Sequence, residues 1–240
     1  MSKRMSQNRT FDIIRLFADE RVIYPASMQR ESWMGASWIP HTEIDIPLGW
    51  SKYGGPAMDI PEGFLLPEGL RFAAQLDLGA LANLDSSGLL PQHGQLLIFA
   101  DIINEVVSVS YHDVSNDALV RHVVEHEDHF FSGVLIKGGC AEVESMEESF
   151  RPKAEWDPKN SSERVWDEFA GSDKSKMFGI YTNCQLDQKD VESIISSGKL
   201  VLLQIGEDGF NDEGVFTVLI PKADLEKRNF SGCECTWAQT

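Results

Sequence analysis

The path of this chain is decided at Gly49-Trp50-Ser51-Lys52-Tyr53-Gly54-Gly55-Pro56, where two aromatic residues and a lysine lead into a glycine pair and a proline. Adjacent glycines permit a positive φ angle or the close approach of another backbone segment. The proline restricts the exit from the stretch and prevents a helix from continuing through it. This combination predicts a fixed corner in the backbone, with the rest of the chain built outward from it as β-sheet.

The composition indicates an ordered, acidic protein. A chain of 240 residues with 42% hydrophobic residues can bury a large core, and we expect a single domain over residues 1–240. Its 38 acidic residues outnumber its 21 basic ones, for a formal net charge of −17. Such a charge repels nucleic-acid phosphates and anionic lipids, so we expect neither as a partner. It is typical of a well-solvated surface, and it also suits a basic protein partner.

The sequence predicts a cytoplasmic protein without a cofactor. No apolar run is long enough to span a membrane, and the residues from Met1 to Ser6 lack the apolar core of a signal peptide. The four cysteines form no Cys-x-x-Cys pair, and we interpret them as reduced thiols. Nothing in the sequence determines the oligomeric state.

Residues 1–46 are expected to form an N-terminal extension. Thr10 is a suitable cap for a short accessory helix over Phe11–Ala18, which carries a modest apolar stripe. Residues 22–24 and 33–39 are typical of strands, because they combine aromatic, β-branched and small residues and each run ends at a proline.

Residues 47–112 are expected to form a first sheet unit. Residues 72–78 and 96–100 are apolar on both faces, which indicates buried strands, while residues 106–111 alternate valine with serine and indicate a half-exposed strand. A meander is the simplest topology for three such strands. Gln75 is the polar exception in its strand, so its amide should find hydrogen-bond partners if it is buried.

Residues 113–173 are expected to form an acidic insert or connector. From Asp101 to Ala170 there are sixteen acidic and six basic residues, so more than half of the net charge lies there. The segment from residue 113 to residue 129 fits a helix or a strand, because its valines suit either. A strand over residues 134–136 is expected to end at a glycine pair. A solvated acidic stretch over residues 142–148 and a short helix over residues 165–169 should follow.

Residues 174–240 repeat the order of features in the first unit. Ser175-Lys176-Met177-Phe178-Gly179 corresponds to Ser51-Lys52-Tyr53-Gly54-Gly55, and Gln204 corresponds to Gln75. A Gly-initiated strand over residues 214–220 corresponds to the one that starts at Gly94. A helix over residues 188–197, ended by Gly198, is inserted in this copy. The sequence thus predicts an α+β fold, rich in mostly antiparallel or mixed sheets with a few short helices, and a possible pseudo-duplication of sheet units.

The corner stretch, Ala74-Gln75-Leu76-Asp77-Leu78, Leu90-Pro91-Gln92-His93-Gly94-Gln95-Leu96 and the tail from Leu203 to Phe230 occur in an order that resembles the YwqG-like family of uncharacterised proteins. The resemblance covers roughly residues 47–230. It implies an α+β fold with large, mostly antiparallel or mixed sheets, and it brings no established activity, substrate or catalytic residue.

The corner and its counterpart provide the candidate ligand-binding residues. A lysine beside glycines can bind an anion together with nearby backbone N–H groups, and aromatic residues can line a pocket. The alternative is that the lysine lies along a tight loop and the aromatic residues pack in the core. The candidates are Trp50, Ser51, Lys52, Tyr53, Gly54, Gly55, Gln75 and Gln204.

A second candidate site lies in the acidic segment. On a helix, His122 and His126 would share one face with His129 close by, which would suit Zn²⁺. The spacing His-x-x-Glu-His would make Glu125 the residue that polarises a metal-bound water. The simpler interpretation is a set of exposed histidines with no metal.

Two classes of function remain open from the sequence. The favoured hypothesis is a non-enzymatic, immunity-like binding protein that presents its acidic surface, mainly residues 101–173, to a basic partner. The alternative is a metal-dependent hydrolase that uses the histidine-rich segment. Whether the protein has any catalytic activity is not decided by the sequence.

Overall fold

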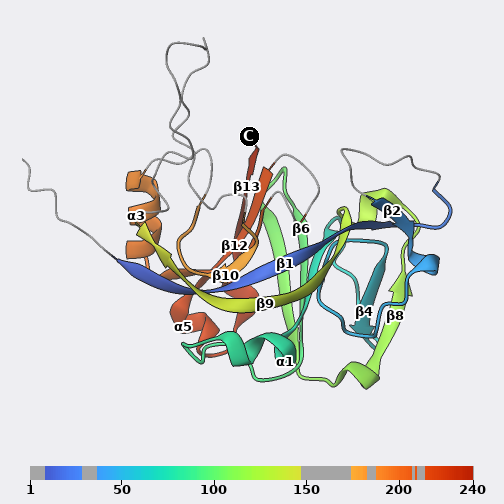
Figure 1. Cartoon of the computed structure of the whole chain (residues 1–240), viewed down its shortest axis with the longest axis horizontal. Coiled ribbons are helices and arrows are strands. Elements are labelled where there is room, and N and C mark those ends of the chain that lie inside the picture. The colour runs from blue at the N-terminus through green and yellow to red at the C-terminus, as the bar shows by residue number, and fades with distance from the viewer. Residues whose placement is uncertain are drawn as a thin grey trace, which may run out of the picture.

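The computed structural model describes residues 9–28, 37–146, 174–182, 188–206, 209 and 214–239. Within these residues, eleven strands form one large sheet and two strands form a small one. Helices are few and short, so the fold is strand-rich and mostly antiparallel, as predicted (Figure 1). Among the described residues, no helix is both long and apolar enough to cross a bilayer.

The large sheet is strongly curved, and its edge strands β7 and β13 lie beside each other. All pairs along it are antiparallel, and β2 (Ser37–Pro40) adds in parallel to the end of β1. The strands, in spatial order, are β13 (Glu234–Gln239), β12 (Gly214–Pro221), β11 (Lys199–Ile205), β10 (Lys176–Phe178), β1 (Thr10–Tyr24), β9 (Gly133–Ser145), β3 (Lys52–Tyr53), β5 (Arg71–Asp77), β6 (Gln95–Asp101) and β7 (Val106–His112).

The small sheet pairs β4 (Ala57–Pro61) with β8 (Leu119–Val123) and covers one part of the outer face of the large sheet. Met58 and Ile60 of β4 pack there against Phe72 and Phe99. This second hydrophobic cluster fixes β4 over β5 and β6. It leaves β8 as the strand farther from the large sheet, at the right of Figure 1.

The helical segments connect or cover the strands, and α3 confirms the predicted helix that ends before Gly198. The α-helices are α1 (Leu78–Leu81), α3 (Gln188–Ser196) and α5 (Lys222–Leu225). The 3-10 helices are η1 (His41–Glu43), η2 (Ala82–Leu84), η3 (Asn116–Ala118), η4 (Glu127–His129) and η5 (Phe230–Gly232).

The main hydrophobic core fills the concave, inner face of the curved sheet. Side chains alternate between the two faces of a strand, so Leu96, Ile98 and Ala100 of β6 lie in this core while Leu97 and Phe99 belong to the cluster on the outer face. Met177 and Leu203 contribute to the same core from the other half of the sheet. Both halves therefore share one interior.

The glycine corner adopts the positive φ angles that its sequence predicts. Gly54 and Gly55 have φ angles of 46° and 88°. A Cβ atom on Gly54 would collide with the carbonyl oxygen of Phe131, and the N–H of Gly55 donates to that same oxygen at 2.7 Å. Only glycine fits this close approach, which holds β3 against the entry to β9.

Replacing Gly54 with alanine is expected to lower the free energy of unfolding by about 2–4 kcal/mol, because left-handed strain adds to a collision with backbone. Gly69 is the matched control. Its φ angle is 75° and a Cβ atom there would meet nothing within 4 Å, so Gly69→Ala should cost only about 1 kcal/mol. Urea denaturation measures both values, and equal losses would contradict the role of the close approach.

The predicted meander is confirmed, since β5, β6 and β7 are consecutive antiparallel neighbours. Residues 113–129, which fitted either a helix or a strand, form β8 between two 3-10 helices. Residues 33–36 of a predicted strand and the predicted helix over residues 165–169 lie outside the described residues.

The prediction of an accessory helix over residues 11–18 is wrong. These residues belong to β1, a strand in the middle of the large sheet that is paired with β9 on one side and β10 on the other. Ile14 and Leu16 are fully buried and alternate with more exposed neighbours, which is the period of a strand. Pairing on both edges has overridden the local helix signal.

Two predictions about residues 134–148 are also wrong. β9 does not end at Gly138-Gly139 but continues to Ser145, because Gly139 opposes Leu16 in β1. Residues 142–145 are therefore strand, and although Glu142 is exposed, Glu144 is only 8% exposed. Residues 147–148 of the predicted acidic stretch lie outside the described residues. Part of the segment expected to be a connector thus lies at the centre of the sheet.

Candidate functional site

The corner contains a buried lysine whose charge is matched by a buried carboxylate. Lys52 in β3 is 2% exposed and its Nζ lies 2.9 Å from Oδ2 of Asp59 in β4, which is fully buried. Arg121 in β8 places Nε 2.7 Å from Oδ1 and Nη2 3.0 Å from Oδ2 of the same carboxylate. The N–H of Gly49 also donates to Oδ2, at 3.0 Å. Asp59 thus joins two sheets and the corner loop.

Side-chain amides continue this network. Gln75 accepts from the N–H of Asp59 at 2.9 Å, and its Nε2 donates to the carbonyl of Asp59 at 3.0 Å and to Oε1 of Gln95 at 2.9 Å. Gln95 donates to Asn116 at 2.7 Å, and Asn116 donates to Asp77 at 2.9 Å. The side-chain groups of this network are bonded to one another, which favours a rigid structural role.

Burial perturbs both charged groups at the corner. Desolvation lowers the pKa of Lys52 to about 8, although the charge of Asp59 opposes the change. Desolvation alone would raise the pKa of Asp59, but hydrogen bonds from Arg121 and Lys52 and their positive charges outweigh it and hold that pKa below its ordinary value. The carboxylate therefore stays ionised as a counter-charge.

A second buried lysine lies in β10. Nζ of Lys176, which is fully buried, lies 2.6 and 2.7 Å from the two carboxylate oxygens of Glu144, and it donates to the carbonyl of Ile180 at 2.7 Å. The N–H of Ile180 donates back to Glu144 at 2.8 Å. Desolvation lowers the pKa of Lys176, and the charge of Glu144 opposes this.

The two lysines occupy comparable positions in their strand pairs. Lys52 is the register partner of Gln75, and Lys176 is the register partner of Gln204. The preceding serine in each case accepts from the backbone N–H two residues beyond that glutamine, at 2.8 Å for Ser51 and 3.0 Å for Ser175.

The matching extends to the backbone around each lysine. Gly54 and Gly55 have positive φ angles, and so do Phe178 and Gly179, at 64° and 81°. The register of β5 shifts between Phe72 and Ala74, and that of β11 shifts between Val201 and Leu203, two residues before the glutamine in each strand. Gly54-Gly55 and Phe178-Gly179 are pairs that the sequence analysis placed in correspondence.

Most of the predicted ligand-binding residues are buried in these networks. Ser51, Lys52, Tyr53, Gly54, Gly55, Gln75 and Gln204 are all buried. Trp50 is the exception, since it is 40% exposed and its indole N–H donates to the carbonyl of Ile136 at 2.9 Å. It borders a groove of about 580 Å³ with Arg21, Lys137 and Asp45.

Sequence reasoning missed the partners of the two lysines. Asp59 stands between apolar residues in β4, a pattern that could have marked it as a buried carboxylate. Glu144 gave no such signal, because it lies in an acidic stretch, and Arg121 gave none because an arginine between valine and histidine is also typical of an exposed strand.

The two networks lie within a single region of family similarity. A family model described as "Domain of unknown function (DUF1963)" matches residues 51–238, from the corner serine to the last strand. The chain belongs to this family. No curated protein matches the chain.

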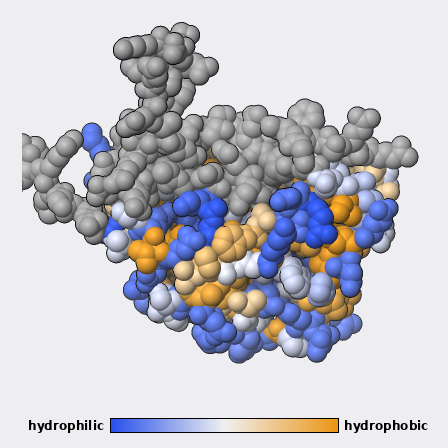
Figure 2. Space-filling model, viewed as in Figure 1, coloured by the Kyte–Doolittle hydropathy of each residue, from blue (hydrophilic) through white to orange (hydrophobic). Residues whose placement is uncertain are grey.

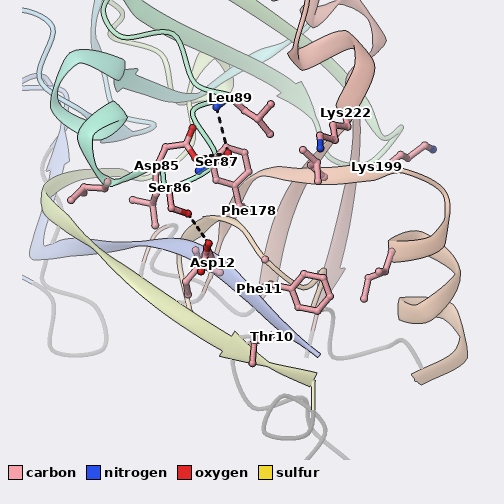
Figure 3. A pocket seen from close by; sticks show the side chains of 16 residues that line it. Thr10, Phe11, Asp12, Asp85, Ser86, Ser87, Leu89, Phe178, Lys199 and Lys222 are labelled. Carbon is pink, nitrogen blue, oxygen red and sulfur yellow. Dashed lines mark hydrogen bonds between the residues drawn. The ribbon is translucent and has the colours of Figure 1, made fainter. Parts of the chain in front are cut away.

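A cleft opens near Phe178 in the DUF1963 domain, with a volume of about 330 Å³. Figure 3 shows the rings of Phe11 and Phe178 in it, with Lys199 and Lys222 on one side and Asp12 on the other, bonded to Ser86 at 2.7 Å. Nζ of Lys199 forms a salt bridge with Oε2 of Glu234 at 2.6 Å. The polar groups Asp12 and Lys199 are thus already bonded within the protein.

The histidine-rich segment of the DUF1963 domain does not form the α-helix that the alternative zinc site would require. His122 lies on β8, His126 precedes η4 and His129 belongs to η4. The ring centroids of His126 and His129 are 6.0 Å apart, but the helical spacing that would add His122 to them is absent. Glu125 accepts a hydrogen bond from Ser27 at 2.5 Å. Within the described part of the chain, no group of three or more potential metal ligands is found.

Acidic side chains are exposed around β8. From Asp101 to Asp128 there are seven acidic residues and one basic residue, Arg121, which is bound to Asp59. Residues on both sides of β8 contribute exposed carboxylates: Asp113, Asp117, Glu125, Glu127 and Asp128. Figure 2 shows apolar and hydrophilic residues intermingled on the side where Figure 1 places β4 and β8.

Proposed function

We propose that this protein is a non-enzymatic binding protein, a YwqG-like member of the DUF1963 family that acts in the cytoplasm and presents an acidic surface to a basic protein partner. The observation that carries the proposal is the set of exposed carboxylates on both sides of β8, from Asp113 to Asp128. Of the cations near them, Arg121 is bound to Asp59, and Arg71 is partly buried against Phe130 and Phe131. An acidic surface of this kind attracts a basic partner and speeds their encounter.

The burial of the other ionic groups supports a binding role over catalysis. Lys52 and Lys176 would be the natural acid–base groups of an active site, but each is enclosed and hydrogen-bonded to its own carboxylate. A catalytic base must reach a substrate within hydrogen-bond distance. These lysines instead serve as internal ties between strands.

We also infer that the large sheet consists of two pseudo-duplicated units, residues 47–112 and 174–240, related by an approximate two-fold axis between β1 and β9. The spatial order supports this, because β3, β5, β6 and β7 follow β9 outward just as β10, β11, β12 and β13 follow β1. The matched lysine–glutamine pairs support the same correspondence. On this view the lysine networks stabilise the two units of the sheet, and the acidic surface binds the partner.

The proposed function predicts a partner complex that is sensitive to salt. Protein captured on the immobilised domain at about 0.1 M salt should be released at about 1 M, where the Debye length falls from about 10 Å to about 3 Å. Released proteins should be basic, and each should rebind in purified form. Complexes that persist unchanged at high salt would contradict the proposal.

Charge variants provide the matched control. A triple variant that neutralises acidic residues around β8 should lose the captured partner: Asp117→Asn, Glu127→Gln and Asp128→Asn. A triple variant that removes the same charge from exposed positions elsewhere should keep it: Asp12→Asn, Glu142→Gln and Glu226→Gln. Equal losses in both variants would point to net charge alone and would contradict a localised acidic surface.

A further inference from the structure

The outer edge of β8 is not paired with any strand in the described part of the chain. We propose that β8 is the docking strand of this protein, and that an extended, basic segment of the partner adds to it as a third strand of the small sheet. This inference rests on the proposed function and specifies how the acidic surface is used. Strand addition gives affinity through main-chain hydrogen bonds, while charges around the edge select the partner.

The register of the β4–β8 pair defines which backbone groups of β8 are available. The N–H of Val124 donates to the carbonyl of Pro56, and His122 opposes Met58 two residues along the strand. Hydrogen-bonded pairs alternate along an antiparallel pair, so His122 directs its backbone groups toward β4. Arg121 and Val123 direct theirs away from β4, and an added strand can bond to them.

The inner edge of the small sheet is closed, so the open edge of β8 is distinctive. The side-chain amide of Gln75 bonds to both the N–H and the carbonyl of Asp59, as a neighbouring strand would. β4 is also buried by its packing on the large sheet. The small sheet can therefore grow only at β8.

β8 lacks the features that usually protect an exposed strand edge. Leu119-Val120-Arg121-His122-Val123 contains no proline and no lysine, and the side chain of Arg121 is turned toward Asp59. Val120 and Val123 are 53% and 40% exposed. Unprotected edges of this kind pair readily with another chain.

The surrounding charge determines the chemistry of the added strand. Asp117 precedes β8, and Glu125, Glu127 and Asp128 follow it, all of them exposed. The segment that fits should therefore carry lysine or arginine near its ends and β-branched residues at its centre, where it meets the exposed valines.

A short synthetic peptide with lysines near both ends and threonines at its centre, blocked at both termini, is the probe. It should bind the full-length protein at low salt, and backbone amide signals of Arg121 and Val123 should shift in a heteronuclear NMR titration. The same peptide N-methylated at alternate residues keeps its charge but loses the backbone N–H donors on one edge. Its affinity should be lower by a factor of about ten or more. A glutamate–threonine peptide should not bind.

Variants at one position test the strand edge from the protein side. Val123→Pro removes an N–H that points away from β4, and an edge strand tolerates this change. The affinity for the lysine–threonine peptide should fall about fivefold. Val123→Thr keeps that N–H and should bind as the wild type does. Circular dichroism of both variants establishes that they are folded.

The outcomes separate this inference from the proposed function. If the N-methylated and unmodified peptides bind equally and both are released by salt, charge alone mediates binding, which overturns strand addition and leaves the acidic binding function intact. If the amide shifts occur away from β8, the assignment of β8 as the docking strand is also wrong. If neither peptide binds and no basic partner is captured in the salt-dependent assay, the proposed function fails as well.

Discussion

Replacing Asp59 with asparagine is expected to lower the free energy of unfolding by about 3–5 kcal/mol, since it leaves a buried ammonium without a counter-charge. Lys52 is 2% exposed and its Nζ lies 2.9 Å from the carboxylate, so water cannot take over this role without a rearrangement. The Arg121 guanidinium would lose two charge-assisted hydrogen bonds at the same time. Urea denaturation followed by circular dichroism measures the loss.

The surface pair Lys199–Glu234 is the matched control for this variant. Its atoms are as close as 2.6 Å, but the two side chains are 31% and 61% exposed. Glu234→Gln should therefore cost less than about 1 kcal/mol. Adding Lys52→Met to Asp59→Asn should restore part of the lost stability, because it removes the unpaired charge. If Asp59→Asn and Glu234→Gln lower the free energy of unfolding by the same amount, burial is not what makes the Lys52–Asp59 pair important.

The ionisation of Asp59 should also affect how the stability of the protein falls at acidic pH. Because the pKa of Asp59 is below its ordinary value in the folded protein, its ionised form adds stability above the unfolded-state pKa of about 4. That contribution is lost as the pH falls through the folded-state pKa. Denaturation midpoints measured from neutral to acidic pH should fall less steeply for Asp59→Asn than for the wild type.

The sequence was sufficient to predict the strands that are apolar on both faces. β5 and β6 are such strands, and the half-exposed β7 completes the predicted meander. Gln75 was also predicted to need hydrogen-bond partners, and its amide bonds to Asp59 and Gln95. A polar residue in an apolar strand is informative because burying it without partners is costly.

Other features could not be predicted because they depend on pairing across long separations. β1 has a helix-like local pattern, and only its neighbours β9 and β10, more than a hundred residues away, determine that it is a strand. Glu144 lies in an acidic stretch that looks solvated, yet it is the partner of Lys176. Local composition carries no information about such a distant partner.

The two buried lysines should respond differently to the same substitution. Lys176→Met is expected to cost about 3–5 kcal/mol, because it removes the cation bonded to both oxygens of Glu144, which is 8% exposed. Within the described part of the chain, the N–H of Ile180 would then remain as the one hydrogen-bond donor to that carboxylate. A buried carboxylate left with a single neutral donor is strongly destabilising.

Lys52→Met is the matched control, and it should cost about 1–2 kcal/mol, because Arg121 continues to neutralise Asp59 through two hydrogen bonds. The two substitutions are chemically identical and occur at corresponding positions beside Gln75 and Gln204, so they remove the same side-chain volume. Any difference in the measured free energy of unfolding therefore reports how well each remaining carboxylate is compensated. Equal costs, or a larger cost at Lys52, would contradict the assignment of Arg121 as the second counter-charge of the corner.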